Sequence, residues 1–186
     1  MENAWYMPKS LPNALKPRIP GREEDDENAP DDEEGIIRAC DRVDEMVRSE
    51  LERGITKDRI VVGGFSQGCA ISLVWGLVGK ERSNVAGVLP MSGYFPLAGR
   101  IGAVRKSRGL KEEPERDKET KKWFYVHGER DLLVPTSLFR QGKSELAKWV
   151  DFERDVEEHL YERMGHSTAP AELRDMLEWL SRVLPP

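Results

Sequence analysis

The chain has 186 residues, which suits one domain with a buried core, and 34% of them are charged. Its net charge of −5 is local, because residues 22–34 hold nine acids and one base, while the rest carries 28 Lys and Arg against 25 Asp and Glu. The total therefore indicates neither a nucleic-acid partner nor an anionic membrane. We expect no stable membrane insertion, since no apolar run approaches the roughly 20 residues of a membrane span. Two cysteines in predicted helices and no evident signal peptide favour a cytoplasmic protein.

The composition predicts one domain with an irregular beginning. Residues 1–34 are expected to form coil and then a solvated acidic loop, with residues 4–7 the only piece expected to pack. Residues 35–186 are expected to form the core. A first helix, capped by Asp31 or Asp32 and ended by Gly54, shows a clear apolar face. That face comprises Ile36, Cys40, Val43, Val47 and Leu51.

Strands and helices then alternate along the chain. Strands are expected at 60–62, 85–91, 123–126 and 156–161, and helices at 67–78, 136–150 and 169–184. The last helix is expected to bury one stripe, formed by Leu173, Met176, Leu177, Leu180 and Leu184. Residues 92–122 are predicted to be a long connection, mobile at the surface from 105 onward. The order predicts an α/β fold with a mostly parallel sheet and helices on both faces.

The stretch G-F-S-Q-G at 64–68 fits the G-x-S-x-G nucleophile elbow, in which a serine sits on a strained strand-to-helix turn. The positions two before and two after the serine must be small, because a side chain there would collide with the neighbouring strand or helix, and glycine occupies both. Ser66 is therefore the predicted nucleophile, and the backbone N–H of Gln67 a predicted oxyanion donor. A glycine-rich turn with a capping serine is the other interpretation, although a nucleotide-binding Gly-x-Gly-x-x-Gly pattern or a phosphate-loop lysine is missing.

A serine nucleophile needs a base and a group that orients the base. His166 lies in a loop after the last predicted strand, where catalytic groups of parallel sheets gather. His127 is expected to be structural, and His159 lies within a strand. Asp131, just past the third strand, is the predicted acid, while Glu129 is expected to face solvent. No metal or cofactor is predicted.

Three motifs together resemble the acyl-protein thioesterase / phospholipase–carboxylesterase family of α/β-hydrolases. They are R-I-V-V-G-G-F-S-Q-G at 59–68, H-G-E-R-D-L-L-V-P at 127–135 and M-G-H-S at 164–167. The resemblance implies hydrolysis of carboxylic esters or thioesters, including acyl groups on S-acylated proteins, by Ser66, Asp131 and His166 without a cofactor. Cys69, where the family usually has glycine, and residues 129–130 are small departures. The acyl chain is expected under the segment that begins at residues 93–97.

The family's His-Gly-x-Gly-Asp loop, which supplies a second oxyanion donor, has no counterpart before Ser66. The resemblance therefore implies an α/β-hydrolase fold that is incomplete at its N-terminus, with an unpaired edge beside the elbow strand. An incomplete gene model, a natural short paralogue, or an edge that pairs with a partner such as a second copy in a homodimer would each explain this. The alternative function is a catalytically impaired hydrolase that binds a ligand or a protein.

Overall fold

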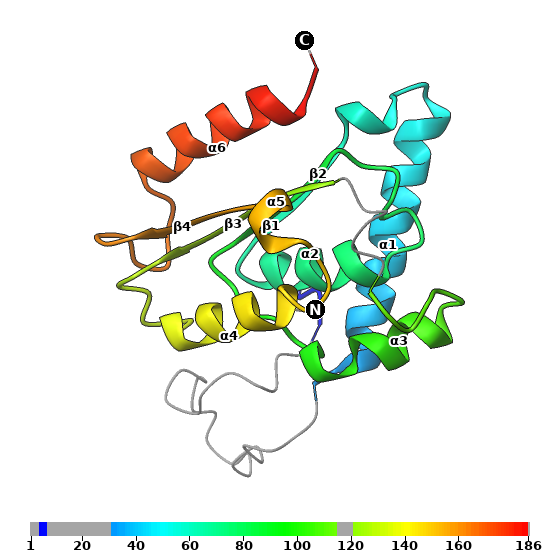
Figure 1. Ribbon diagram of the computed structural model, residues 1–186, viewed down its shortest axis with the longest axis horizontal. Coiled ribbons are helices and arrows are strands. Elements are labelled where there is room, and N and C mark those ends of the chain that lie inside the picture. The colour runs from blue at the N-terminus through cyan, green and yellow to red at the C-terminus, as the bar shows by residue number, and fades with distance from the viewer. Residues whose placement is uncertain (1–3, 7–30, 115–120, 186) are drawn as a thin grey trace.

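The computed structural model describes residues 4–6, 31–114 and 121–185. Its centre is a parallel sheet of four strands in the order β1-β2-β3-β4 (Figure 1). The strands are β1 (Val61–Phe65), β2 (Gly87–Met91), β3 (Lys122–Gly128) and β4 (Val156–Tyr161). The α/β fold with a parallel sheet, predicted from the alternation of strands and helices, is confirmed.

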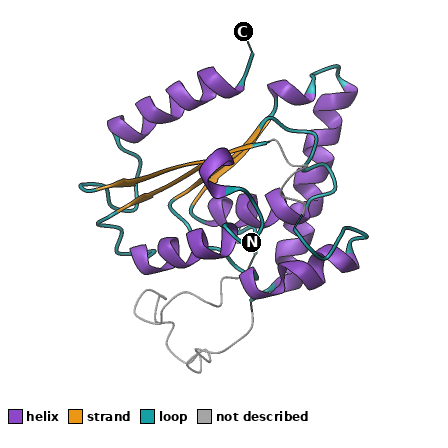
Figure 2. Cartoon of the chain, viewed as in Figure 1, coloured by secondary structure: helices purple, strands orange, loops and turns teal. Residues whose placement is uncertain are grey.

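Helices cover both faces of this sheet (Figure 2). On one face, α2 (Gln67–Val78) packs on β1 and β2, and α1 (Glu33–Glu52) packs on α2. The same face carries α3 (Ile101–Ser107) and α4 (Thr136–Leu146), while α6 (Pro170–Val183) lies on the other face in Figure 1. The short elements η2 (Lys57–Arg59), η3 (Ala98–Arg100) and α5 (Phe152–Asp155) connect the larger ones.

Side chains alternate between two cores along the buried strand β3. Trp123 and Tyr125 point into the larger core under α1, α2 and α4, and Phe124 and Val126 point into the smaller core under α6. This alternation follows from the period of two in a strand. A strand that is buried on both faces reads as a continuous apolar run, as residues 123–126 do.

The first helix matches its prediction. Asp32 caps α1, since its carboxylate accepts a hydrogen bond from the N–H of Gly35 at 3.0 Å. Four of the five predicted face residues are buried and Leu51 is partly buried against them. Gly54 follows the helix with φ of 90°, a conformation that favours glycine.

The predicted apolar stripe of α6 is right for Met176 and Leu180, which pack against the smaller core, and wrong for Leu173 and Leu177. Leu173 and Leu177 are 45% and 64% exposed, whereas Glu172 and Trp179 are buried against the sheet. The helix is rotated because the Trp179 ring fills the space above Gly87 and contacts Phe124, with ring centroids 5.6 Å apart. The largest aromatic side chain therefore sets the buried face.

The prediction of a mobile surface segment from residue 105 is wrong for its described first part. Residues 101–107 form α3, which buries Ile101, Val104 and Arg105. Residues 115–120 lie outside the described residues, as do residues 1–3 and 7–30 of the predicted coil and acidic loop. Of the piece expected to pack, Tyr6 is buried and its hydroxyl donates to the Tyr94 hydroxyl at 2.9 Å.

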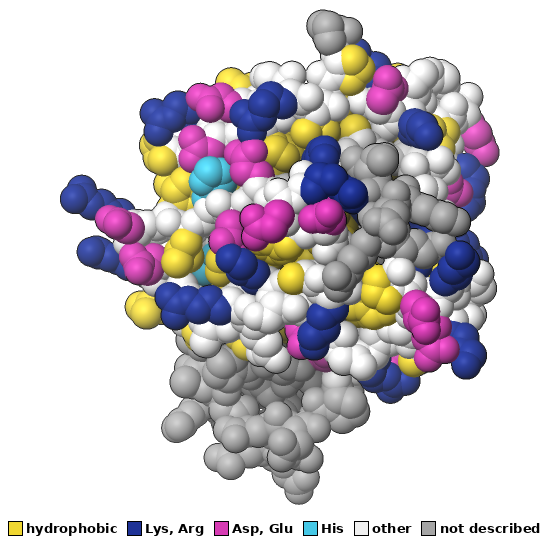
Figure 3. Space-filling model, viewed as in Figure 1, with side chains coloured by type: hydrophobic (Ala, Val, Ile, Leu, Met, Phe, Trp, Pro, Cys, Tyr) yellow, Lys and Arg dark blue, Asp and Glu magenta, His cyan; other side chains and the backbone are white. Residues whose placement is uncertain are grey.

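Three further features complete the description. On the face shown in Figure 3, the described basic and acidic side chains stand beside one another without forming a patch of one sign. Among the described residues, no helix has the length and apolar character that crossing a membrane requires. β1 is an edge strand, and no described strand pairs with its outer edge.

Candidate active site

Ser66 lies on a strained turn between β1 and α2. Its φ of 58° and ψ of −114° fall in a region that non-glycine residues rarely adopt. The turn is fixed because the Ser66 N–H donates to the Met91 carbonyl at 3.0 Å, and α2 begins at the next residue. The serine hydroxyl is thereby presented beyond the carboxyl ends of β1 and β2.

The two glycines of the motif differ in their surroundings. A Cβ on Gly64 would collide with the backbone of Gly68, so position 64 requires glycine. A Cβ on Gly68 would meet no described atom within 4 Å, so the predicted collision at this position is wrong. Gly93 is a third glycine, not recognised from the sequence, since a Cβ there would lie 2.6 Å from the Ser66 carbonyl oxygen. The turn therefore depends on glycines 64 and 93.

The structure brings Ser66, His166 and Asp131 together although they lie far apart in the sequence. His166 Nε2 is 2.9 Å from the Ser66 hydroxyl, and His166 Nδ1 is 2.7 Å from Asp131 Oδ2. The Asp131 side chain is fully buried, and 14% of the His166 side chain is exposed. The His166 imidazole thus connects the Ser66 hydroxyl, which can give up a proton, to the Asp131 carboxylate, which can only accept hydrogen bonds.

Backbone contacts hold the two loops that carry Asp131 and His166 against each other. The N–H of Glu129 donates to the Tyr161 carbonyl, and the N–H of Arg130 donates to the Met164 carbonyl, both at 2.9 Å. Gly128 allows this approach, because a Cβ there would collide with the Met164 carbonyl oxygen. The loops that carry Asp131 and His166 are therefore held in contact as one unit.

Further contacts fix each side chain of the unit. Asp131 Oδ1 accepts hydrogen bonds from the N–H groups of Leu133 and Val134 at 2.9 and 2.8 Å. The His166 ring packs against Phe65, with centroids 4.8 Å apart. The contact of Phe65 was not predicted, although its position directly before the serine is a signal that could have revealed it.

The remaining candidates lie where the sequence suggested, outside the chain of bonds from Ser66. His127 is buried and its Nε2 is 2.8 Å from the Val134 carbonyl oxygen. Burial lowers the pKa of His127. His159 lies on β4 with its Nε2 3.1 Å from Glu157, and Glu129 is exposed.

Gln67 is the first residue of α2, so its N–H belongs to the helix terminus, where backbone N–H groups have no partner within the helix. The positive end of the helix dipole favours negative charge at the same place. The Gln67 side chain turns to the N-terminal piece, accepting a hydrogen bond from the Trp5 N–H at 3.3 Å. This arrangement suits Gln67 to the predicted oxyanion role.

Other reactive groups lie apart from this chemistry. Cys40 and Cys69 are buried free thiols, as predicted, and burial raises the pKa of Cys40 to about 12 and that of Cys69 as well. A raised pKa keeps a thiol protonated and unreactive. Within the described ranges, no group of three or more His, Cys, Asp or Glu side chains could hold a metal ion.

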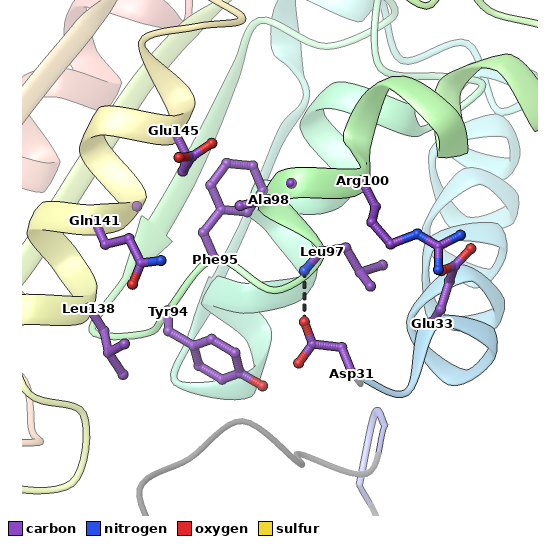
Figure 4. A pocket seen from close by; sticks show the side chains of 12 residues that line it. Asp31, Glu33, Tyr94, Phe95, Leu97, Ala98, Arg100, Leu138, Gln141 and Glu145 are labelled. Atoms are coloured by element: carbon purple, nitrogen blue, oxygen red, sulfur yellow. Dashed lines mark hydrogen bonds and ion pairs between the residues drawn. The ribbon is translucent and has the colours of Figure 1, made fainter. Parts of the chain in front are cut away.

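A cavity of about 590 Å³ is lined by the segment after β2, by η3, by α4 and by the start of α1 (Figure 4). Tyr94, Phe95, Leu97 and Leu138 supply apolar walls, and Tyr94 follows the Gly93 that touches Ser66. Its rim is polar: the remaining side chains that line it include Asp31, Glu33, Arg100, Gln141 and Glu145. The segment that begins at residue 93 is therefore a buried wall of a cavity.

Comparison with known proteins is consistent with this geometry. A family model described as phospholipase/carboxylesterase matches residues 21–184. Acyl-protein thioesterase 1 of Mycosarcoma maydis is 35% identical over 178 residues, which cover 87% of this chain and 66% of the relative. Acyl-protein thioesterase 1 of Emericella nidulans is 35% identical over 155 residues, which cover 83% and 60%. The chain thus spans less than two thirds of the length of these relatives.

Solved structures agree on the fold. SOBER1 of Arabidopsis thaliana superposes with a TM-score of 0.72 at 21% identity, covering 98% of this chain and 74% of its own. Acyl-protein thioesterase 2 of Zea mays superposes with a TM-score of 0.64 at 22% identity, covering 86% and 69%. From the matched family model and the sequence relatives, the chain belongs to the phospholipase/carboxylesterase family of α/β-hydrolases.

Proposed function

We propose that this protein is a serine hydrolase that cleaves carboxylic esters or thioesters through an acyl-enzyme. The observation that carries the proposal is the continuous contact from Ser66 through His166 to Asp131, with distances of 2.9 and 2.7 Å. The strained turn at Ser66 and the family membership support it further. The name of the relatives, acyl-protein thioesterase 1, supports thioesters, including those of S-acylated proteins, as the proposed substrates of this chain.

In the proposed reaction, the Ser66 hydroxyl oxygen attacks the acyl carbonyl carbon while His166 Nε2 accepts its proton. Asp131 holds the imidazole through Nδ1 and stabilises the imidazolium that forms. The Gln67 N–H stabilises the oxyanion at the helix terminus. The imidazolium then protonates the leaving alkoxide or thiolate as the acyl-enzyme forms. A water molecule, deprotonated by His166, attacks the acyl carbon, and the imidazolium returns the proton to the Ser66 oxygen as the acid leaves.

The acyl chain is proposed to lie in the cavity walled by Tyr94 and Phe95, which follow the Gly93 that packs against Ser66, because its apolar walls suit a hydrocarbon chain. Replacing Leu138 with Trp should fill part of it without touching Ser66, His166 or Asp131. We expect kcat/KM for a palmitoyl thioester to fall much more than kcat/KM for an acetyl ester. Equal losses on both substrates would place the chain elsewhere.

Labelling with a fluorophosphonate probe tests the proposed nucleophile. We expect purified protein to be labelled, and Ser66→Ala to lose the label while keeping the wild-type thermal unfolding temperature. His166→Ala should label far more slowly, because the hydroxyl then has no base. Folded wild-type protein that does not react, or Ser66→Ala protein that still does, would refute the proposal.

The open edge of β1 supports a second role, as an interface. We propose that two copies associate through this edge, which has no described strand beside it. This fits the alternative of a protein-binding module, but the assembled Ser66, His166 and Asp131 favour an enzyme.

The buried free thiols Cys40 and Cys69 suit the reducing cytoplasm, which is the proposed location.

A further inference from the structure

His127 is a buried polar side chain that the proposed reaction does not use. It lies at the end of β3, directly before the Gly128 that contacts the loop of His166. Its ring is fully buried and stacks on Phe139, with centroids 5.2 Å apart and planes 25° apart. A polar ring in such a place needs a hydrogen-bonding reason, because burying it without one is costly.

The reason is a bond to the loop that carries the catalytic acid. His127 Nε2 is 2.8 Å from the Val134 carbonyl oxygen, and since a carbonyl only accepts, Nε2 carries the proton and donates. The N–H of the same Val134 donates to Asp131 Oδ1 at 2.8 Å. Val134 is therefore held from both sides, by the His127 ring and by the Asp131 carboxylate.

The same nitrogen also faces the carboxylate. His127 Nε2 lies 3.7 Å from Asp131 Oδ2, the oxygen that contacts His166 Nδ1 at 2.7 Å. Backbone N–H groups thus occupy one oxygen of Asp131, and two imidazoles face the other. At 3.7 Å the His127 N–H is too distant to take the place of His166 as hydrogen-bond partner, but its dipole favours the ionised carboxylate.

A neutral ring suits this place better than a charged one. Burial and the nearby His166 lower the pKa of His127, outweighing Asp131 and the Val134 carbonyl, which raise it. Nδ1 is buried and has no hydrogen-bond partner in the described part of the chain, so a second proton there would be an unpaired donor. A positive charge would also compete with His166 for Asp131. The neutral ring can hold the loop without that competition.

We propose that His127 is a positioning residue, which orients Asp131 toward His166 by donating from Nε2 to the Val134 carbonyl. The inference rests on the proposed hydrolase function. It differs from a packing role, in which any ring that fills the space against Phe139 would serve. The donor is what matters here, so the variants must separate the donor from the volume.

His127→Gln and His127→Asn make a matched pair, because both are buried amides and only the longer one reaches the Val134 carbonyl. With a short-chain thioester, we expect His127→Asn to lower kcat by roughly 10- to 100-fold at unchanged KM, as for a misplaced catalytic group. In the pH profile of kcat/KM for His127→Asn, the acid limb should move to lower pH, because a less well aligned Asp131 stabilises the His166 imidazolium less. His127→Gln should stay within about 3-fold of wild type, since its donor is kept.

Wild-type kcat and an unshifted acid limb in His127→Asn would overturn the inference, as would equal losses in both variants. If His127→Asn does not fold, His127→Phe, which keeps the stacking on Phe139 without a donor, replaces it under the same criteria. Wild-type protein without Ser66-dependent turnover refutes the proposed function instead. The low-field proton resonance of His166 Nδ1 then decides on His127: its loss in His127→Asn and retention in His127→Gln support the inference, and its retention in both overturns it.

Discussion

At the scale of single residues, the proposed catalytic site depends on backbone positions as much as on the side chains of Ser66, His166 and Asp131. Ser66 keeps a backbone conformation that costs of order 1–3 kcal/mol, and the surroundings must hold it there. Gly64 and Gly93 allow this because they let the backbone of neighbouring segments approach the turn. The hydroxyl is thus held near His166 before any substrate arrives.

The first prediction compares the two glycines of the motif. Gly64→Ala should destabilise the protein by about 1–3 kcal/mol, as overpacking does, and should abolish labelling of Ser66, because its Cβ collides with Gly68. Gly68→Ala is the matched control, since its Cβ meets no described atom and alanine favours a helix by about 1 kcal/mol. Thermal unfolding and probe labelling measure both effects. A Gly68→Ala variant as damaged as Gly64→Ala would contradict this view of the turn.

Glu172 carries a second prediction, on pH. This carboxyl is fully buried, and burial raises its pKa, although the Ala169 N–H bonded to Oε2 at 3.3 Å opposes the rise. Below the unfolded value of about 4.3, both states are protonated and Glu172 has no pH effect. As the pH rises, the unfolded state ionises first, so stability is lost until the folded pKa is reached.

Glu172→Gln should remove this loss. We expect the unfolding temperature of the variant, relative to wild type, to increase from about pH 4 to neutral pH. Glu178→Gln, an exposed position on the same helix, is the control and should show a constant difference. If the difference for Glu172→Gln is also constant, then Glu172 titrates alike in both states and the prediction is wrong.

Residue types and their place after strands were enough to select Ser66, Asp131 and His166 from the sequence. A serine between glycines, an acid after the third strand and a histidine after the fourth converge wherever the strands are parallel. The sequence could not show that Gly68 faces open space while Gly93 touches the turn. Such contacts depend on how separate segments pack, which no local pattern contains.

At the scale of elements, α3 stabilises the end of α2. Arg105 is 2% exposed and donates to the carbonyls of Leu77 and Lys111, both at 2.6 Å. Arg108 donates to the Val78 carbonyl at 2.8 Å and pairs with Asp44 at 2.9 Å. The last carbonyls of a helix have no partner within it, so these guanidinium groups supply the missing hydrogen bonds. Their positive charge also interacts favourably with the negative end of the helix dipole.

Arg105→Met should therefore destabilise the protein by about 2–3 kcal/mol, because it leaves buried carbonyls without a charged donor. Lys106→Met offers a neighbouring control, since its side chain is exposed and its ammonium forms a surface pair with Glu112 at 3.2 Å. That change should stay within about 0.5 kcal/mol. Denaturant unfolding measures both. Similar small effects would show that α3 packs without supporting α2.

Periodicity was a good guide for α1 and a poor one for α3 and α6. The apolar spacing of α1 is regular over about four turns, and it predicted the buried face. α3 has seven residues, and its buried Arg105 reads as a surface charge in the sequence, because its carbonyl partners Leu77 and Lys111 lie outside the helix. In α6 the leucines outnumber Trp179, yet the one aromatic ring determines the rotation. Counting apolar residues cannot weigh them by volume.

At the scale of the whole molecule, one side of the sheet differs from the other. β4 is flanked by charged contacts with α6, since Tyr161 donates to Asp175 and Arg182 pairs with Glu157. On α6, Leu173 and Leu177 lie on the side away from these contacts, and both are exposed. The edge of β1 lies at the end of the sheet opposite to β4, on the side to which these leucines point.

That residues 35–186 form one domain remains a prediction.

The groups at the β1 edge are self-complementary. Ile60 and Ser66 bond to the chain around β2, through the Ile60 carbonyl at 2.8 Å and the Ser66 N–H at 3.0 Å. Because bonding directions alternate along a strand, Val61, Gly63 and Phe65 present their N–H and C=O groups to the open edge. An antiparallel pair centred on Gly63 would place Val61 of one copy opposite Phe65 of the other. Both copies of α6 would then lie on one face, with their exposed leucines toward each other.

We therefore expect this chain to dimerise through β1, with a molar mass that doubles as concentration rises in light scattering. Replacing Leu173 and Leu177 with Lys should return it to a monomer, because like charges would face each other across the two-fold axis. Leu132→Lys is the control: Leu132 is 81% exposed, but it lies in the loop after Asp131, away from this edge. Leu132→Lys should therefore dimerise as the wild type does. A monomer at every concentration would exclude pairing, and a dimer that survives both lysines would place the interface on another surface.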